Sequence, residues 1–165
     1  MSDTTKVSGD LHIGLATDAR AAVTAVLNAL LADEFMLYSR ARAFHWNVTG
    51  RHFSSDHKLF EDEYEALDEI IDDVAERTRA LGGKVPARLA DYVEHARLED
   101  VESRGMSAEA MIASLRDGHE AVARQLRADT AIADEHGDEG TADFLTGLME
   151  GHEKRAWMLR SHLEG

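Results

Sequence analysis

The chain lacks cysteine altogether and has one proline among its 165 residues. Without cysteine there are no disulfides, thiolate metal sites or cysteine nucleophiles, so histidine and carboxylate side chains remain as the available metal ligands. Any metal site is therefore of the hard or borderline kind. No apolar run approaches the roughly 20 residues of a membrane span. The first residues, MSDTTKVSGDLHIG, lack both a basic start and a long apolar segment, so we expect no signal peptide and a cytoplasmic location.

Basic residues are also scarce relative to acidic ones. The chain has 18 Lys and Arg against 32 Asp and Glu, a formal charge of −14. Affinity for nucleic acid comes largely from Lys and Arg that release counterions from phosphates, so this balance disfavours a nucleic-acid surface. It favours the attraction of cations instead.

The apolar periodicity is helical between glycine-rich breaks and predicts four long helices, at about 17–47, 54–81, 107–135 and 138–163. A short amphipathic helix is expected within RLADYVEHARL (88–98), in the connection between the second and third long helices. We predict an all-α, antiparallel four-helix bundle with one long crossover, which is the ferritin-like arrangement. Residues 1–16 are expected to form a short flexible tail before a single domain at 17–165. Residues expected in the core include Leu27, Leu31, Leu67, Ile71 and Val74.

Four helical residues of metal-binding type stand out: His45, His57, Asp72 and Glu76. Asp72 and Glu76 are four residues apart and share a helix face. Fifteen residues separate His57 from Asp72, a rise of about 22 Å on one helix, which no single ion spans. If the histidines join the carboxylates, they come from a second subunit. The alternative is an ordinary helix-end histidine pair and a solvated acidic face. The chain contains no Glu-x-x-His, so the usual intrachain di-iron site is unsupported.

Five segments, in this order, resemble the Dps family of mini-ferritins, named for DNA-binding proteins from starved cells. They are HWNVTG (45–50), FSSDH (53–57), DDVAERTRALGG (72–83), LADYVEHARLED (89–100) and DEHGDEGTADFL (134–145). The resemblance implies a hollow homododecamer with ferroxidase centres at the subunit dyads, each holding up to two irons. His45 and His57 would come from one subunit, and Asp72 and Glu76 from its mate.

The same resemblance implies a ferroxidase-type oxidoreductase that oxidises Fe(II), preferably with hydrogen peroxide, and stores the ferric mineral, thereby limiting oxidative damage. Glu61, one turn after His57, is expected to help hold a second, looser iron. Trp46, next to a ligand, is expected to act as a radical sink.

An acidic group near the start of the last helix resembles the lining of the family's threefold pores, through which Fe(II) would enter. The alternative is a polar turn whose Asp138 and Glu139 favour the next helix's N-terminus. The predicted pore residues are Asp134, Glu139 and Asp143.

The sequence lacks the lysine-rich tail with which DNA-condensing members of the family bind DNA. The first sixteen residues contain Lys6 alone against Asp3 and Asp10, so we expect weak or absent DNA binding. A nucleoid-coating protein that shields DNA is thus a disfavoured alternative. A bundle that binds cations without redox work is another. The remaining histidines are expected to be surface or packing residues: His12, His52, His95, His119, His136, His152 and His162.

Overall fold

The computed structural model describes residues 6–86 and 88–164, and these form five helices and no strand. The all-α prediction is confirmed, and the helix ends lie within about one residue of those expected from the sequence. The helices are α1 (Thr17–Asn47), α2 (Phe53–Ala80), α3 (Leu89–His95), α4 (Ala108–Glu135) and α5 (Glu139–Leu163).

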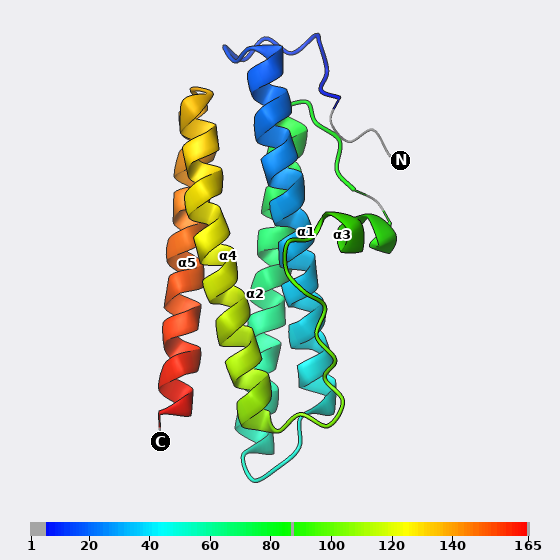
Figure 1. Ribbon diagram of the computed structural model, residues 1–165, viewed down its shortest axis with the longest axis vertical. Helices are drawn as coiled ribbons and strands as arrows, with labels where there is room; N and C mark the ends of the chain where they lie inside the picture. Colours follow the sequence, from blue (N-terminus) through cyan, green and yellow to red (C-terminus); the bar gives the residue numbers. More distant parts are fainter. Residues whose placement is uncertain (1–5, 87, 165) are drawn as a thin grey trace.

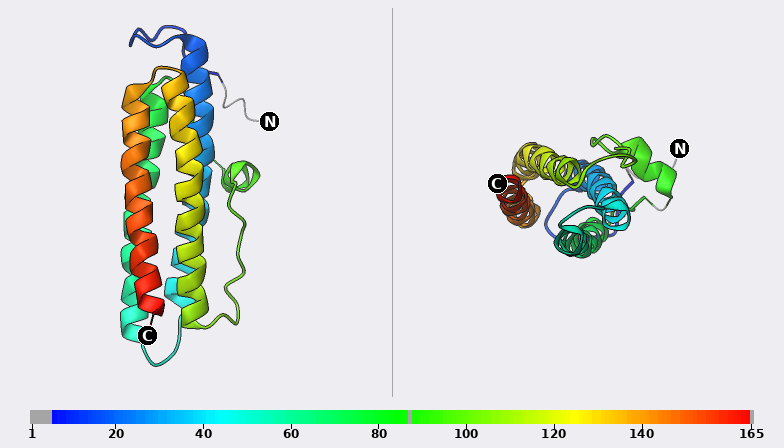
Figure 2. Two further views of the ribbon diagram at one scale, coloured as in Figure 1. Left: turned by 60° about the vertical axis from the view of Figure 1, so that its left-hand side comes forward. Right: turned by 90° about the horizontal axis from the view of Figure 1, so that it is seen from below.

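The four long helices form an antiparallel bundle in which α1 pairs with α2 and α4 pairs with α5 (Figure 1). The connection from α2 to α4 returns along the full length of the bundle, so α2 and α4 run in the same direction. This crossover carries α3, which packs on the outer flank of α1 (Figure 2). The predicted architecture, with its extra element between the second and third long helices, is therefore the observed one.

The core lies between the long helices and is built largely from leucine. Leu27, Leu31, Leu67 and Val74 are buried as expected, whereas Ile71 is half-buried at the bundle surface. The helix ends follow the expected chemistry. The Ser107 hydroxyl accepts a hydrogen bond from the Ala110 amide at 3.2 Å, and α2 is followed by Gly82 with a φ of +81°.

One expectation about apolar runs needs correction. An 18-residue stretch of α1 is long and apolar enough to cross a membrane by length and composition, and 56% of it is buried inside the protein. The same helix buries Arg20, Asp33, Glu34 and Arg40. A central helix of a bundle contacts neighbours around much of its circumference, so it becomes nearly as apolar as a membrane span.

The described part of the N-terminal segment, residues 6–16, contains no helix or strand. The Ser8 amide donates to the Gly82 carbonyl at 3.0 Å, and the Arg20 guanidinium donates to the Ser8 carbonyl at 2.9 Å. These bonds hold the segment near the end of α2. The predicted flexible tail begins in residues 1–5, which lie outside the described residues, and it stays a prediction.

Candidate metal centre

His45 and His57 lie side by side at the turn that joins α1 to α2. His45 is in the last turn of α1, and His57 follows the start of α2. Their rings stack with centroids 3.7 Å apart and an interplanar angle of 22°. The turn therefore brings together the two histidines that the sequence separates by twelve residues.

Reciprocal hydrogen bonds fix the protonation of the two rings. His45 Nδ1 lies 2.9 Å from the His57 carbonyl oxygen, and His57 Nδ1 lies 2.8 Å from the His45 carbonyl oxygen. A carbonyl oxygen can only accept, so each Nδ1 carries the proton. In the neutral imidazole the lone pair then resides on Nε2, the tautomer that a metal ligand needs. Each of the two half-buried imidazoles thus presents an Nε2 lone pair that can bind a metal ion.

Glu61 lies one turn beyond His57 on α2. Its carboxylate pairs with Lys58 at 2.9 Å. Hydrogen bonding and charge from Lys58 lower the pKa of Glu61. Glu61 therefore offers an ionised oxygen ligand near the histidine pair, which is what its expected role at a second, looser iron needs.

Asp72 and Glu76 are exposed on α2, where Asp72 lines a shallow depression with Ile71 and Ala75. Because α2 is continuous from Phe53 to Ala80, these carboxylates are held far along the helix from His57. Within residues 6–86 and 88–164, no group of three or more histidines and carboxylates converges on one point. The joining of all four residues across two subunits stays a prediction.

Aromatic side chains surround the histidine pair. The edge of Tyr64 meets His45 with centroids 5.2 Å apart. The Arg42 guanidinium lies 4.2 Å from the Tyr64 ring centre and 5.4 Å from that of Trp46. Trp46 is 68% exposed. Trp46, the expected radical sink, therefore lies at the surface. It belongs to a group of aromatic and cationic side chains that extends to His45.

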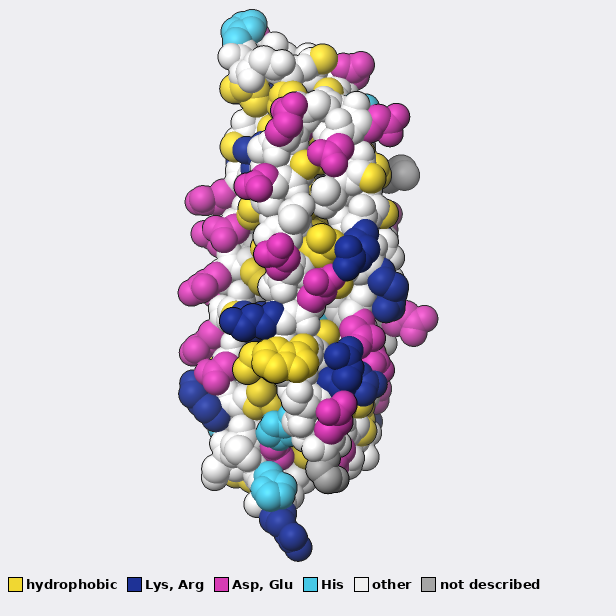
Figure 3. Space-filling view, turned by 90° about the vertical axis from the view of Figure 1, so that its left-hand side faces the viewer, with side chains coloured by type: hydrophobic (Ala, Val, Ile, Leu, Met, Phe, Trp, Pro, Cys, Tyr) yellow, Lys and Arg dark blue, Asp and Glu magenta, His cyan; other side chains and the backbone are white. Residues whose placement is uncertain are grey.

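The predicted pore residues Asp134, Glu139 and Asp143 are all exposed around the turn between α4 and α5. Asp138 has a different role, because it is buried, caps α5 through the Thr141 amide at 3.0 Å and pairs with Arg77 at 2.9 Å. Figure 3 shows acidic side chains toward this end of the α5 face, while Lys and Arg gather toward the other end. The pore assignment stays a prediction, and the capping alternative holds for Asp138.

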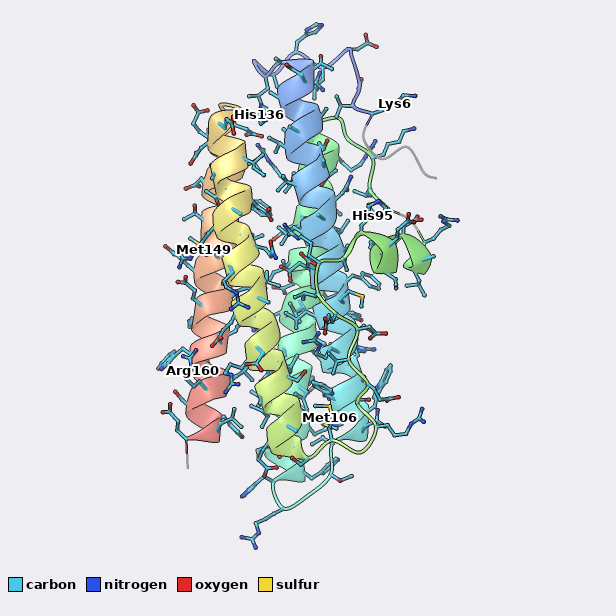
Figure 4. The ribbon with its side chains drawn as sticks, viewed as in Figure 1. Lys6, His95, Met106, His136, Met149 and Arg160 are labelled. Carbon is cyan, nitrogen blue, oxygen red and sulfur yellow. The ribbon has the colours of Figure 1, made fainter. Side chains whose placement is uncertain are left out.

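The remaining histidines lie in two kinds of environment. His95 and His136 lie at the periphery, as Figure 4 shows. His119 and His152 are instead fully buried, and their Nδ1 atoms are 2.9 Å apart between α4 and α5. These two are therefore packing residues, which is one of the two roles expected for them, and they also contact each other, which the sequence did not indicate.

Glu34 and Glu63 complete this buried group, so each long helix contributes one residue. No short motif identifies them, because the four positions are scattered over the sequence. The available signal is a charged residue inside an apolar stripe, such as Glu34 between Leu31 and Leu37. Burial lowers the pKa of His119, although the bond to Glu63 acts in the opposite direction.

Comparison with known proteins gives the family. Residues 24–165 match the ferritin-like domain. A low temperature-induced protein of Nostoc sp. is 44% identical over 156 residues, which cover 94% of this chain and 87% of that protein. A DNA protection during starvation protein of Brevibacillus brevis is 36% identical over 148 residues, 90% of this chain and 99% of the relative. The chain belongs to the Dps family of ferritin-like proteins.

A solved Dps structure agrees over nearly the whole length. The Dps protein of Vibrio cholerae O1 superposes with a TM-score of 0.89 at 30% identity, covering 96% of this chain and 99% of that one. That protein is described as a member of a broad superfamily of ferritin-like diiron-carboxylate proteins. The chain thus belongs to a family in which iron held by carboxylates is the common theme, and iron storage is consistent with that membership.

Proposed function

We propose that this Dps protein is a ferroxidase and iron store. It oxidises Fe(II), preferably with hydrogen peroxide, and keeps the ferric mineral inside a hollow homododecameric shell in the cytoplasm. The observation that carries the proposal is the locked pair of His45 and His57. Their Nδ1 atoms are occupied by carbonyl groups, so both Nε2 lone pairs are available to Fe(II).

A second copy of the chain completes the centre. Asp72 of the partner subunit and Glu76 of the partner subunit would supply the oxygen ligands, since α2 holds each chain's own pair too far from its histidines. Leu89 and Val93 of α3 are exposed apolar residues. Such residues are commonly covered in an assembly, which supports oligomerisation.

The ligand set suits the reaction. Imidazoles and carboxylates bind Fe(II), and the carboxylates hold Fe(III) more strongly because its charge is higher. One hydrogen peroxide accepts two electrons from two Fe(II) ions and, with two protons, leaves two waters. The role of His45, His57 and the partner's carboxylates is to hold the two irons together so that both electrons reach one peroxide. Pairing the electrons in this way avoids releasing a hydroxyl radical.

Three further assignments belong to the same proposal. Glu61 holds the second, looser iron, and its ionised carboxylate beside both imidazoles supports this role. Trp46 takes up an oxidising equivalent that escapes the centre. Around a threefold axis, copies of the exposed acidic residues at the α4–α5 turn would focus a negative potential that draws Fe(II) inward. These pore residues are Asp134, Glu139 and Asp143.

The decisive experiment is anaerobic. The purified protein is loaded with two Fe(II) per chain and mixed with peroxide while ferric absorbance is followed, and iron is then assayed in the high-mass fraction. Rapid oxidation with retained iron is expected. Asp72→Asn should slow oxidation, whereas Asp73→Asn, one residue further and also exposed, should not. Oxidation at the rate of a protein-free control would overturn the proposal and favour passive cation binding.

A further inference from the structure

The buried group that the proposed ferroxidase does not use is the core His–Glu cluster: Glu34 of α1, Glu63 of α2, His119 of α4 and His152 of α5. Glu34, His119 and His152 are 0% exposed, and Glu63 is 5% exposed. Glu63 is two residues from Glu61 and so points to the opposite side of α2. The cluster is therefore inside the bundle, away from the histidine pair near the surface.

Glu63 determines which nitrogen of His119 is free. Its Oε2 lies 3.0 Å from His119 Nε2 and 3.5 Å from the Arg155 guanidinium. A carboxylate only accepts hydrogen bonds, so the Nε2 of His119 is the protonated atom. In a neutral imidazole the lone pair is then on Nδ1, which points at His152. This is the carboxylate–histidine arrangement found behind metal ligands.

The two imidazoles are close enough that either a hydrogen-bonding proton or a metal ion lies between them. His119 Nδ1 and His152 Nδ1 are 2.9 Å apart, and two lone pairs at that distance would repel unless a proton or a metal ion lies between them. Bonds of about 2.0–2.1 Å from a transition metal to two imidazoles place the nitrogens about 2.9–3.4 Å apart at angles from a right angle to tetrahedral. The observed separation matches the lower end of this range.

Glu34 is the unsatisfied member. His152 Nε2 lies 2.9 Å from Glu34 Oε1, but neither atom has a properly directed hydrogen bond, and the second oxygen of Glu34 has none. A fully buried carboxylate without directed donors is costly, and Arg155 pairs with Glu63 instead. The chain thus keeps a carboxylate in the bundle centre that no hydrogen bond holds in place.

We propose that the core His–Glu cluster binds one divalent first-row transition-metal ion per chain, through Nδ1 of His119, Nδ1 of His152 and a carboxylate oxygen of Glu34. Glu63 orients His119 from behind. Imidazole and carboxylate ligands suit Zn²⁺, Co²⁺ and Fe²⁺. In residues 6–86 and 88–164 no three such donors already converge, so Glu34 must rotate about its side-chain bonds on binding. Its lack of directed hydrogen bonds leaves it free to do so.

Co²⁺ is the probe, because its visible absorption reports both binding and geometry. The background is the full chain with His45→Gln, His57→Gln, Asp72→Asn and Glu76→Gln, which removes the imidazoles as well as the carboxylates of the proposed dyad centre. Equilibrium dialysis should show one Co²⁺ per chain in this background. Adding His119→Gln should abolish that binding, and adding Glu34→Gln, which keeps the side-chain shape, should weaken it at least about tenfold. Adding His162→Gln, at an exposed histidine, should change neither stoichiometry nor affinity.

Two outcomes would overturn the proposal. Either the folded background binds no Co²⁺, in which case the two imidazoles share a proton, or His119→Gln and Glu34→Gln both leave binding unchanged. Circular dichroism and gel filtration establish that each variant is folded, and Glu34→Gln serves as the test if His119→Gln is not. Because the imidazoles and carboxylates of the dyad centre are absent throughout, the result is independent of whether the proposed ferroxidase reaction occurs.

Discussion

At the scale of single residues, the most informative feature is a pair of backbone hydrogen bonds. They orient His45 and His57 and select the tautomer that each presents. A side chain that bonds the same carbonyl but has no imidazole Nε2 cannot replace either histidine as a metal ligand.

His57→Gln is therefore expected to slow peroxide-dependent Fe(II) oxidation by at least about tenfold, the scale on which metal-site substitutions usually act. Stopped-flow absorbance of ferric product measures this rate. His52→Gln, at an exposed histidine nearby, is the control and should behave as the unchanged protein. Equal rates for the two variants would remove His57 from the centre.

The two tryptophans provide an internal comparison for the radical sink. Trp46 is 68% exposed and Trp157 is 59% exposed, so a freely diffusing oxidant would attack them about equally. If the oxidant forms at the centre, Trp46 should be oxidised several-fold more than Trp157, because Trp46 is adjacent to the ligand His45. Peptide mass spectrometry after Fe(II) and peroxide treatment gives the ratio, and equal labelling would argue against a sink.

At the scale of the elements, Arg97 of the crossover joins two helices of the bundle. The Arg97 guanidinium donates to Asp33 of α1 at 2.7 Å and to Asp129 of α4 at 2.8 and 2.9 Å. Asp33 also accepts from the amides of Arg97 and Leu98. Burial raises the pKa of Asp33 more than Arg97 lowers it, which shows how far this carboxylate has been removed from water.

Arg97→Met should lower the free energy of unfolding by about 3–5 kcal/mol, because it leaves two buried carboxylates without their cation. Urea denaturation followed by circular dichroism measures the change. The matched variant is Arg104→Met, whose side chain is exposed and pairs only loosely with Glu102 at 3.6 Å. It should cost less than about 1 kcal/mol.

Replacing either of two helical glycines by alanine should change stability in opposite directions. A Cβ on Gly118 of α4 would lie 2.6 Å from Leu37 Cδ1 and 2.9 Å from the Arg40 guanidinium, whereas one on Gly147 of α5 would meet nothing within 4 Å. Gly118→Ala should destabilise by about 1–3 kcal/mol through overpacking of α1 against α4. Gly147→Ala should stabilise by up to about 1 kcal/mol through helix propensity. The same sign in thermal unfolding for both variants would contradict this view of the α1–α4 contact.

At the scale of the whole molecule, charge governs the choice of partner. In the proposed dodecamer, twelve copies at −14 each would carry roughly −168, and such a charge attracts Fe(II) and repels polyanions. Lys6 is the single basic residue in the first sixteen. Gel shift of duplex DNA at low micromolar protein and physiological salt should show no complex. A stable, salt-sensitive shift would instead support the DNA-shielding alternative.

The sequence alone was sufficient for the helices, their order and the family. Apolar periodicity and glycine breaks are local properties, so they locate α1, α2, α4 and α5 without knowledge of contacts. The spacing from His57 to Asp72 also excluded a one-chain site, because the rise of a helix is the same in every protein. The likeness in five segments then pointed to the residues of a shared centre.

Tertiary structure decided which polar groups meet. Glu34, Glu63, His119 and His152 lie on four different helices, and whether they touch depends on the rotation and register of those helices, which no local pattern encodes. The tautomers of His45 and His57 likewise depend on how the turn after α1 presents its carbonyls. Local sequence thus determines the elements, whereas their packing determines the chemistry at the points where they meet.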